Sequence, residues 1–177
     1  MSRLALVPAF LFALLIDDGT DPLWRVTAAI IFGIASLTDR FDGDLARRRG
    51  LVTNFGTIAD PIADKALIGA ALVGMSMLGE LAWWITILIG VRELGVTALR
   101  FWVLRYGVIP ASRGGKVKAL AQVVAIGLYV LPLPVSAYPV RWAVMGVAVV
   151  LTVATGIDYV VRALRLRATG RRAVALP

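Results

Sequence analysis

Apolar residues fill six long blocks of the chain, and short polar stretches separate these blocks. The blocks are Leu4–Ile16, Trp24–Thr38, Ile58–Leu78, Ala82–Leu104, Val117–Leu131 and Val140–Val161. Turn-forming sequences lie between them: DDGTDP at 17–22, RRRG at 47–50, GE at 79–80, YGVIPASRGG at 106–115 and PLPVSAYP at 132–139. Apolar runs that approach the roughly 20 residues needed to cross a bilayer are typical of transmembrane helices. The pattern therefore predicts an all-α integral membrane protein with six transmembrane helices, formed by a single domain over residues 1–177.

The second block is too short to span a membrane by itself. It holds about 15 apolar residues, against the roughly 20 that a span needs. We therefore expect its helix to continue through Asp39 and Asp42 to about Arg47. The two carboxylates would then lie in the last turns of a membrane helix and face a polar cavity, because a charge exposed to lipid is costly.

Composition agrees with a membrane protein and limits the chemistry. Hydrophobic residues make up 59% of the chain and charged residues only 17%, with a mean hydropathy of +0.83. A soluble domain would have about a quarter of its residues charged. The chain has no Cys and no His, which excludes thiol nucleophiles, histidine bases, disulfides and Cys/His zinc sites. Catalysis or metal binding must use carboxylates, lysines, tyrosines or hydroxyl groups.

The distribution of charge predicts the orientation. Acidic residues follow the first and third blocks: Asp17, Asp18, Asp21 and Glu80. Basic residues follow the second and fourth blocks and fill the C-terminal tail: Arg40, Arg47, Arg48, Arg49, Arg105, Arg113, Lys116, Lys118, Arg162, Arg165, Arg167, Arg171 and Arg172. Because cytoplasmic loops carry the excess of Lys and Arg, we expect a multi-pass protein of the cell membrane with both termini and the acidic motif on the cytoplasmic side. This bias also accounts for most of the net charge of +8. The partners it favours are the lipid bilayer and anionic substrates rather than nucleic acid.

Four carboxylates form the strongest chemical signal in the chain. Asp39 and Asp42 are three residues apart, and Asp60 and Asp64 are four apart. Either spacing puts two side chains on one face of a helix. If the two helices pack antiparallel, the carboxylate oxygens of the two pairs converge into a site for hard divalent ions. The residues thus predict a metal site for Mg²⁺, with two ions and with Mn²⁺ as an alternative.

One Asp-x-x-Asp pair is commonly a solvated helix end, but the full pattern here is far more specific. It consists of eight residues: Asp39, Asp42, Gly43, Ala46, Arg47, Gly56, Asp60 and Asp64. On this motif, the chain resembles the CDP-alcohol phosphatidyltransferase family. The resemblance implies that CDP-diacylglycerol is a substrate and that CMP leaves when an alcohol attacks its phosphorus. It also implies a homodimer.

The resemblance further implies a role for each motif residue. Asp39, Asp42 and Asp60 resemble metal ligands, and Asp64 resembles both a ligand and the catalytic base for the acceptor hydroxyl. The remaining positions resemble the binding site for the nucleotide and diphosphate: Gly43, Ala46 and Gly56 leave space, and Arg47 pairs with phosphate. Family members usually have more sequence upstream of an arginine that Arg3 resembles, so this chain starts late, and two explanations stay open: a truncated N-terminus or a misassigned start codon.

The acceptor is predicted from basic residues after the motif: Arg92, Arg100, Arg113, Lys116 and Lys118. Together they suit an acceptor that carries a phosphate. Two other interpretations stay open, a structural ion pair of Arg92 with Glu93 or an Asp, and simple flanking charge for Lys116 and Lys118.

The sequences TNFGTIADPIADKALIG, VRELGVTALR and GGKVKALAQ resemble the branch of the family that makes phosphatidylglycerophosphate from sn-glycerol 3-phosphate, especially its actinobacterial members. Phosphatidylinositol-phosphate synthase and cardiolipin synthase share the motif and remain alternatives. A cation-coupled transporter is disfavoured, because the carboxylates cluster at one membrane face. The small residues Ala66, Ala70 and Gly74 predict close helix packing, either within the bundle or at a dimer interface.

Overall fold

The protein is an all-α bundle, as the apolar blocks predict. The computed structural model describes the backbone of residues 2–49, 54–103 and 113–174 and the side chains of residues 6–38, 65–103 and 114–168. Its helices are α1 (Ser2–Leu15), α2 (Pro22–Arg49), α3 (Asn54–Met77), α4 (Trp83–Val103), α5 (Arg113–Val130) and α6 (Tyr138–Val174), with short 3-10 turns η1 (Ile16–Gly19) and η3 (Val135–Ala137). Within the described ranges there is no strand.

Each apolar block corresponds to one helix, and two helices run past their blocks. α2 continues through the first acidic pair to Arg49, which confirms that the second block is extended by polar residues. α6 continues to Val174, well beyond the apolar block that ends at Val161. Its length is about 55 Å at 1.5 Å per residue.

One segment of the described chain is long and apolar enough to cross a membrane by length and composition. It is Val135–Ala168, whose most apolar 18-residue stretch has a mean hydropathy of 2.0, and it covers η3 and most of α6. Pro22–Thr38 and Lys65–Met77 are apolar helices of shorter length. The number of membrane spans therefore stays a prediction.

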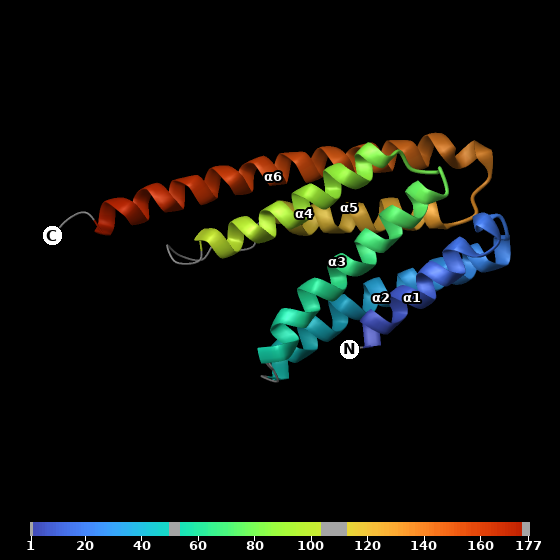
Figure 1. Cartoon of the computed structure of the whole chain (residues 1–177), viewed down its shortest axis with the longest axis horizontal. Helices are drawn as coiled ribbons and strands as arrows, with labels where there is room; N and C mark the ends of the chain where they lie inside the picture. Colours follow the sequence, from blue (N-terminus) through green and yellow to red (C-terminus); the bar gives the residue numbers. More distant parts are fainter. Residues whose placement is uncertain (1, 50–53, 104–112, 175–177) are drawn as a thin grey trace.

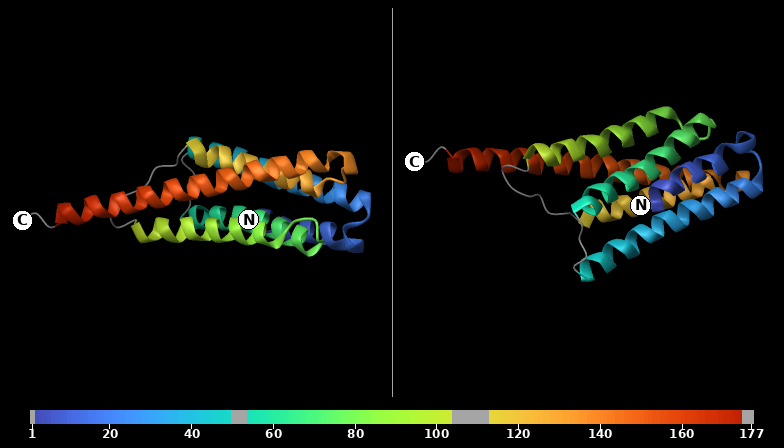
Figure 2. Two further views of the ribbon diagram at one scale, coloured as in Figure 1. Left: turned by 90° about the horizontal axis from the view of Figure 1, so that it is seen from above. Right: turned by 60° about the horizontal axis from the view of Figure 1, so that its bottom comes forward.

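The helices pack closely at one end of the bundle and diverge toward the other. α1 packs along α2 and α3, while α6 packs along α5 and α4. Figure 1 shows α3 and α4 separating from the turn that they share, and Figure 2 shows the same divergence from other directions. We call the end that contains η1, η3 and the α3–α4 turn the closed end.

Glycine shapes the turn between α3 and α4. Gly79 has φ +71°, a left-handed conformation that favours glycine. The next amide, that of Glu80, donates to the carbonyl of Met75 at 3.0 Å, which is the hydrogen bond that ends many helices with such a glycine. This turn brings Glu80 to the closed end of the bundle.

At the closed end, Glu80 accepts hydrogen bonds from two buried arginines of other helices. Arg25 of α2 donates from Nη1 and Nη2 to the two carboxylate oxygens, at 2.5 and 3.1 Å, and Arg141 of α6 donates from Nη1 at 2.9 Å. Both arginines are less than a tenth exposed. Because the three residues come from three parts of the chain, this ion-pair cluster ties α2, α6 and the α3–α4 turn together.

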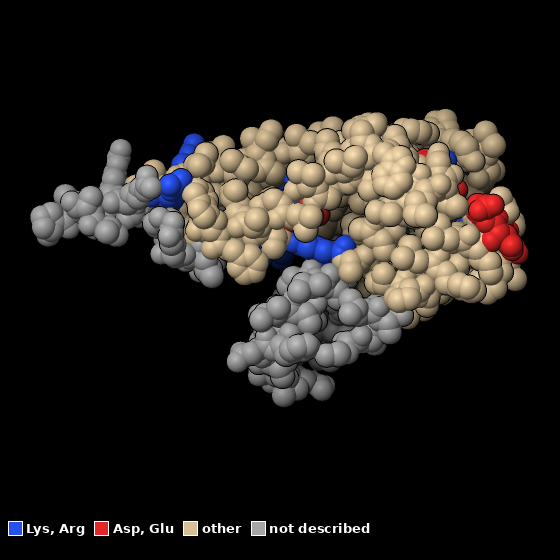
Figure 3. Space-filling model, in the orientation of Figure 1, with Lys and Arg blue, Asp and Glu red and all other residues tan. Residues whose placement is uncertain are grey.

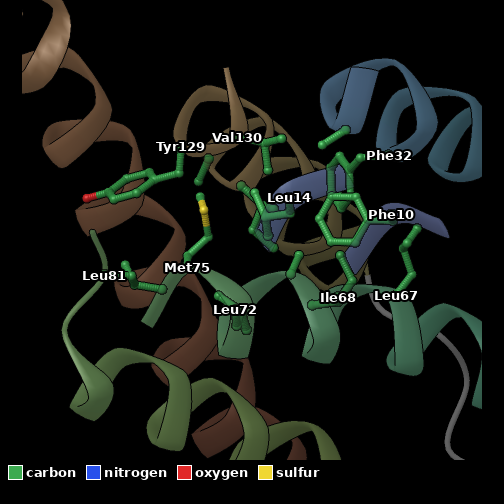
Figure 4. Packing of buried hydrophobic residues seen from close by; sticks show 14 of the residues in the cluster. Phe10, Leu14, Phe32, Leu67, Ile68, Leu72, Met75, Leu81, Tyr129 and Val130 are labelled. Carbon is green, nitrogen blue, oxygen red and sulfur yellow. The ribbon is translucent and has the colours of Figure 1, made fainter. Parts of the chain in front are cut away.

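An apolar core lies between α1, α2, α3 and α5. Figure 4 shows Phe10 and Phe32 side by side, with Leu14 and Ile68 next to them; the two rings have centroids 5.8 Å apart. Gly74 lets α1 approach α3, since a Cβ at that position would lie 2.7 Å from a methyl group of Leu14. Gly74 is one of the three small residues expected to allow close helix packing, and the close packing at Gly74 is therefore within the bundle.

Candidate active site

The acidic motif lies where α2 ends and α3 begins. The backbone of Asp39 and Asp42 belongs to α2, and that of Asp60 and Asp64 belongs to α3. Asp39 lies seventeen residues from the first residue of α2, and Asp60 seventeen residues from the last residue of α3. Each is thus about 25 Å along its helix from the closed end. The two helices contact each other, and Figure 1 shows these two ends next to each other.

The side chains of the motif lie outside the described residues. This applies to all eight motif positions: Asp39, Asp42, Gly43, Ala46, Arg47, Gly56, Asp60 and Asp64. Within the side chains that are described, no group of three or more acidic residues could hold a metal ion. Metal ligation by the motif therefore stays a prediction, and the described part of the site begins one residue later, at Lys65.

Lys65 connects α3 to α4. Its Nζ donates to the backbone carbonyl of Glu93 at 3.2 Å and to the hydroxyl of Thr97. Thr97 in turn donates to the same carbonyl of Glu93 at 2.8 Å. Because Lys65 directly follows Asp64, these bonds fix the turn of α3 that carries the last aspartate of the motif.

Glu93 holds two further cations. Its Oε1 accepts from Nζ of Lys118 and, at 3.0 Å, from Nη1 of Arg92. Arg92 also donates from Nη2 to the hydroxyl of Thr155 on α6, at 2.9 Å. This confirms the structural interpretation of Arg92, a pair with Glu93. It also shows that Lys118 is not simple flanking charge, since it is only 5% exposed and bound to the same carboxylate.

A cavity of about 210 Å³ lies beside this cluster, between α3, α4 and α5. Its polar lining comes from Lys65, Glu93, Lys118 and Gln122. Its apolar lining comes from Ile68, Gly69, Leu72, Ile89, Gly90, Leu94, Ala119 and Val123. Lys65 and Lys118 each lie twelve residues from the closed-end terminus of their helix, or about 18 Å. The cavity is therefore about 7 Å deeper in the bundle than Asp60.

The cluster around the cavity has more positive than negative charge. Of the described residues that line the cavity, Lys65 and Lys118 are basic and Glu93 is acidic, and Arg92 pairs with Glu93 from outside the cavity. Figure 3 shows basic side chains in a hollow at mid-molecule, and acidic side chains at the closed end, where Asp17 and Asp18 are exposed. An excess of cations in a partly enclosed space attracts an anion.

The basic residues predicted to bind the acceptor are not all together. Lys118 lines the cavity, whereas Arg92 lines a different, apolar groove between α4 and α6. Arg100 and Lys116 are exposed, and the side chain of Arg113 lies outside the described residues. Sequence reasoning missed Lys65 and Gln122 and considered Glu93 only as a partner. Lys65 and Glu93 could have been found, because each is a charge inside an apolar block, as Arg92 is.

Comparison with known proteins adds to this geometry. The profile of the CDP-alcohol phosphatidyltransferase family matches residues 1–154. The chain is 58% identical over 163 residues to a Mycobacterium tuberculosis H37Rv protein named probable phosphatidylglycerophosphate synthase, covering 92% of this chain and 78% of the relative. It is 37% identical over 172 residues to the Bacillus subtilis protein named CDP-diacylglycerol–glycerol-3-phosphate 3-phosphatidyltransferase, covering 90% and 89%. A Shigella flexneri protein of the same name is 35% identical over 163 residues, covering 89% and 87%.

Proposed function

The chain belongs to the CDP-alcohol phosphatidyltransferase family, and on that premise we propose that it transfers the phosphatidyl group of CDP-diacylglycerol to sn-glycerol 3-phosphate. The products are phosphatidylglycerophosphate and CMP. One observation carries the choice of acceptor: a cavity between α3, α4 and α5, lined by Lys65 and Lys118, begins one residue after Asp64 of the aspartate motif. Relatives that are 35–58% identical carry the names of this activity.

The donor set fits a pair of divalent metal ions. Asp39, Asp42, Asp60 and Asp64 offer only oxygen ligands, and the chain has no Cys or His. Hard ions such as Mg²⁺ prefer oxygen ligands, and Mn²⁺ can use the same set. When bound, two such ions would neutralise the diphosphate and stabilise the departing CMP.

Residues of the chain itself supply the remaining chemistry. Asp64 takes the proton from the attacking hydroxyl of the acceptor, as a general base. Lys65 holds Asp64 in position by binding α4 through Glu93 and Thr97. On the donor side, Arg47 pairs with the diphosphate. The small residues Gly43, Ala46 and Gly56 leave room for the nucleotide.

The acceptor phosphate fits the cavity side of the cluster. Lys65 and Lys118 line the cavity with charged donors, and charge-assisted hydrogen bonds suit a phosphate. Arg92 acts indirectly, by sharing the carboxylate of Glu93 with Lys118. Arg100, Arg113 and Lys116 would attract the anionic acceptor to the mouth of the site.

The protein is proposed to cross the cell membrane six times as a single domain, with the active site and both termini on the cytoplasmic side. Exposed tryptophans at both ends of α4 support a membrane-spanning position for this helix. Trp83 and Trp84 begin α4, and Trp102 lies near its end, about 28 Å away. This distance matches the roughly 30 Å hydrocarbon core, whose two interfaces are enriched in tryptophan. A homodimer remains part of the proposal.

An acceptor panel tests the function. Purified protein is given CDP-diacylglycerol, Mg²⁺ and one acceptor, and CMP release and the lipid product are measured. We expect sn-glycerol 3-phosphate to be used far better than inositol 1-phosphate or phosphatidylglycerol. A preference for inositol 1-phosphate or for phosphatidylglycerol would assign the protein to another branch of the family. No CMP release with any acceptor would contradict the enzymatic proposal and favour the transporter alternative.

A further inference from the structure

Gln122 of α5 is an uncharged polar side chain in a cavity whose other described polar residues are charged. It is only 4% exposed. It lies four residues after Lys118, so the two side chains share one face of α5. Because Gln122 has no charge, it does not contribute to the attraction of an anion. A buried amide beside open space can instead recognise an uncharged polar group of the substrate.

The hydrogen bonds of Thr152 on α6 fix which way the amide of Gln122 points. Nε2 of Gln122 donates to Oγ1 of Thr152 at 3.0 Å. Thr152 is fully buried, and its hydroxyl donates its one proton to the backbone carbonyl of Ala148, at 2.6 Å. Thr152 can therefore only accept a hydrogen bond from Gln122. The amide must present its NH2 group to Thr152, which leaves its carbonyl oxygen, Oε1, on the other side.

The oxygen Oε1 of Gln122 is an acceptor at the cavity. Within the described part of the chain no group donates a hydrogen bond to it, and it is not one of the fully enclosed polar atoms of that part. Because the rest of Gln122 is buried and the residue lines the cavity, the open surface of this oxygen faces the cavity. A carbonyl oxygen only accepts, so it suits a hydroxyl group rather than an ionised phosphate oxygen.

We propose that Oε1 of Gln122 accepts a hydrogen bond from the hydroxyl on the middle carbon of sn-glycerol 3-phosphate, and that this bond selects among phosphorylated alcohols. The inference rests on the proposed function and adds to it a second group of the acceptor that the site recognises. Thr152 is a positioning residue, because it acts only by orienting the amide of Gln122.

The depth of the residues in the bundle fits this assignment. Lys65 and Lys118 lie about 18 Å from the closed end, whereas Gln122 lies eight residues, or about 12 Å, from the closed-end terminus of α5. With the phosphate at the two lysines and the attacking hydroxyl at Asp64, both ends of the acceptor lie on the motif side of Gln122. The hydroxyl on the middle carbon then points deeper into the cavity, toward Oε1. A compound without this hydroxyl leaves Oε1 unpaired, and sites that bind a substrate hydroxyl reject such analogues.

A comparison of two acceptors tests the inference. 3-Hydroxypropyl phosphate has the attacking hydroxyl and the phosphate of sn-glycerol 3-phosphate but no hydroxyl on the middle carbon. CMP release from CDP-diacylglycerol is measured with each acceptor for the full-length protein in detergent, and the ratio of the two kcat/KM values gives the preference.

Two variants change the proposed contact, and two are matched controls. Gln122→Met removes the acceptor oxygen and keeps a side chain of similar length, and Thr152→Val removes the anchor of the amide. Thr152→Ser keeps the anchoring hydroxyl. Thr86→Val removes a buried hydroxyl of α4 that does not line the cavity.

We expect the unmodified protein to prefer sn-glycerol 3-phosphate by about ten- to a hundredfold, the effect of leaving one buried acceptor unpaired. Gln122→Met should lower kcat/KM for sn-glycerol 3-phosphate by about this factor and leave the value for 3-hydroxypropyl phosphate nearly unchanged, so that the preference disappears. Thr152→Val should weaken the preference, whereas Thr152→Ser and Thr86→Val should keep it.

Equal use of both acceptors by the unmodified protein would overturn the inference and leave the proposed function intact. So would a full preference in Gln122→Met, or equal losses with both acceptors in a Gln122→Met protein that unfolds at the same temperature as the unmodified one. If Gln122→Met does not fold, equal preferences in Thr152→Val and Thr152→Ser would overturn the inference. No CMP release with either acceptor would contradict the proposed function itself, and the inference with it.

Discussion

Glu80 and Glu93 each accept hydrogen bonds from two basic side chains, yet their surroundings differ. At the closed end, the charged side chains hold helices of the bundle together. Arg25 donates to Glu80 and also to the backbone carbonyls of Tyr129 and Val130, at 2.7 and 3.0 Å. Arg141 lies over the rings of Tyr129 and Tyr138, 4.4 and 4.1 Å from their centroids.

The cluster of Glu93 is arranged differently, since it borders an open space. Two of its members, Glu93 and Lys118, line the cavity together with Lys65. The cavity lies next to the part of α3 that carries the aspartate motif. A glutamate paired with basic side chains therefore stabilises the closed end in one place and lines a cavity for an anion in the other. Ion pairing by itself does not separate a structural cluster from a binding one, whereas the presence of adjoining space does.

The largest effect that we expect concerns the metal ligands. Asp39→Asn should lower kcat/KM by roughly a thousandfold or more, because the carboxylate would bind an ion that stabilises charge in the transition state. Asp18→Asn makes the same chemical change at the closed end and should leave the rate unchanged. The measurement is CMP release, and EDTA should abolish it in the unmodified protein. Full activity in the chelator would contradict metal dependence.

The next effect concerns the catalytic base. Asp64→Asn keeps the shape of the side chain but cannot accept the proton, so kcat should fall by about 10²–10⁴-fold. Binding of CDP-diacylglycerol, measured separately, should survive. If substrate binding were lost while turnover of bound substrate continued, Asp64 would be a binding residue instead.

Neutralising the two glutamates should separate stability from activity. Glu80→Gln leaves Arg25 and Arg141 buried without a counter-charge, and we expect a loss of about 3 kcal/mol in the free energy of unfolding. Glu93→Gln should cost less stability, because water in the cavity can solvate Lys118, but it should change the KM for the acceptor. Thermal unfolding in detergent and steady-state kinetics measure the two effects. Equal destabilisation by both variants would remove the distinction between the clusters.

Substitutions at two glycines of α3 test the same comparison with smaller expected effects on stability. Gly74→Ala would force Leu14 to move in the core, since the new Cβ lies 2.7 Å from its methyl group, and should cost about 1–2 kcal/mol of stability. Gly69 lines the cavity and has no atom within 4 Å of a Cβ placed there. Gly69→Ala should therefore be neutral or stabilising by about 0.5–1 kcal/mol. A larger loss for Gly69→Ala in thermal unfolding would show that the cavity is not open there.

The sequence predicts the helices well, because apolar runs and turn residues act locally. The continuation of α2 past Asp39 follows from the length that a span needs, and the structure confirms it. The pairing of Glu80 with Arg25 and Arg141 could not be predicted, because these residues lie far apart in the chain and meet only through helix packing. The full length of α6 was also missed, because its last turns are polar and carry no apolar signal.

The candidate site was predicted in part for a similar reason. The aspartate motif is a local pattern with fixed spacing, so it stands out in a single sequence. The cavity depends on which faces of α3, α4 and α5 meet, and no local pattern encodes that. Lys118 was therefore included among the predicted acceptor-binding residues because of its charge. Lys65 was missed because it directly follows the more conspicuous aspartate motif.

The most direct test of the account compares Lys118→Met with Arg141→Met, which remove one cation from the cavity cluster and one from the closed end. A charged hydrogen bond to a phosphate contributes about 1.5 kcal/mol or more, so Lys118→Met should raise the KM for sn-glycerol 3-phosphate by roughly tenfold. The KM for CDP-diacylglycerol should not change. Arg141→Met should lower thermal stability and leave both KM values unchanged. If the two variants had the same KM for sn-glycerol 3-phosphate, the cavity cluster would not be the binding site for the acceptor phosphate.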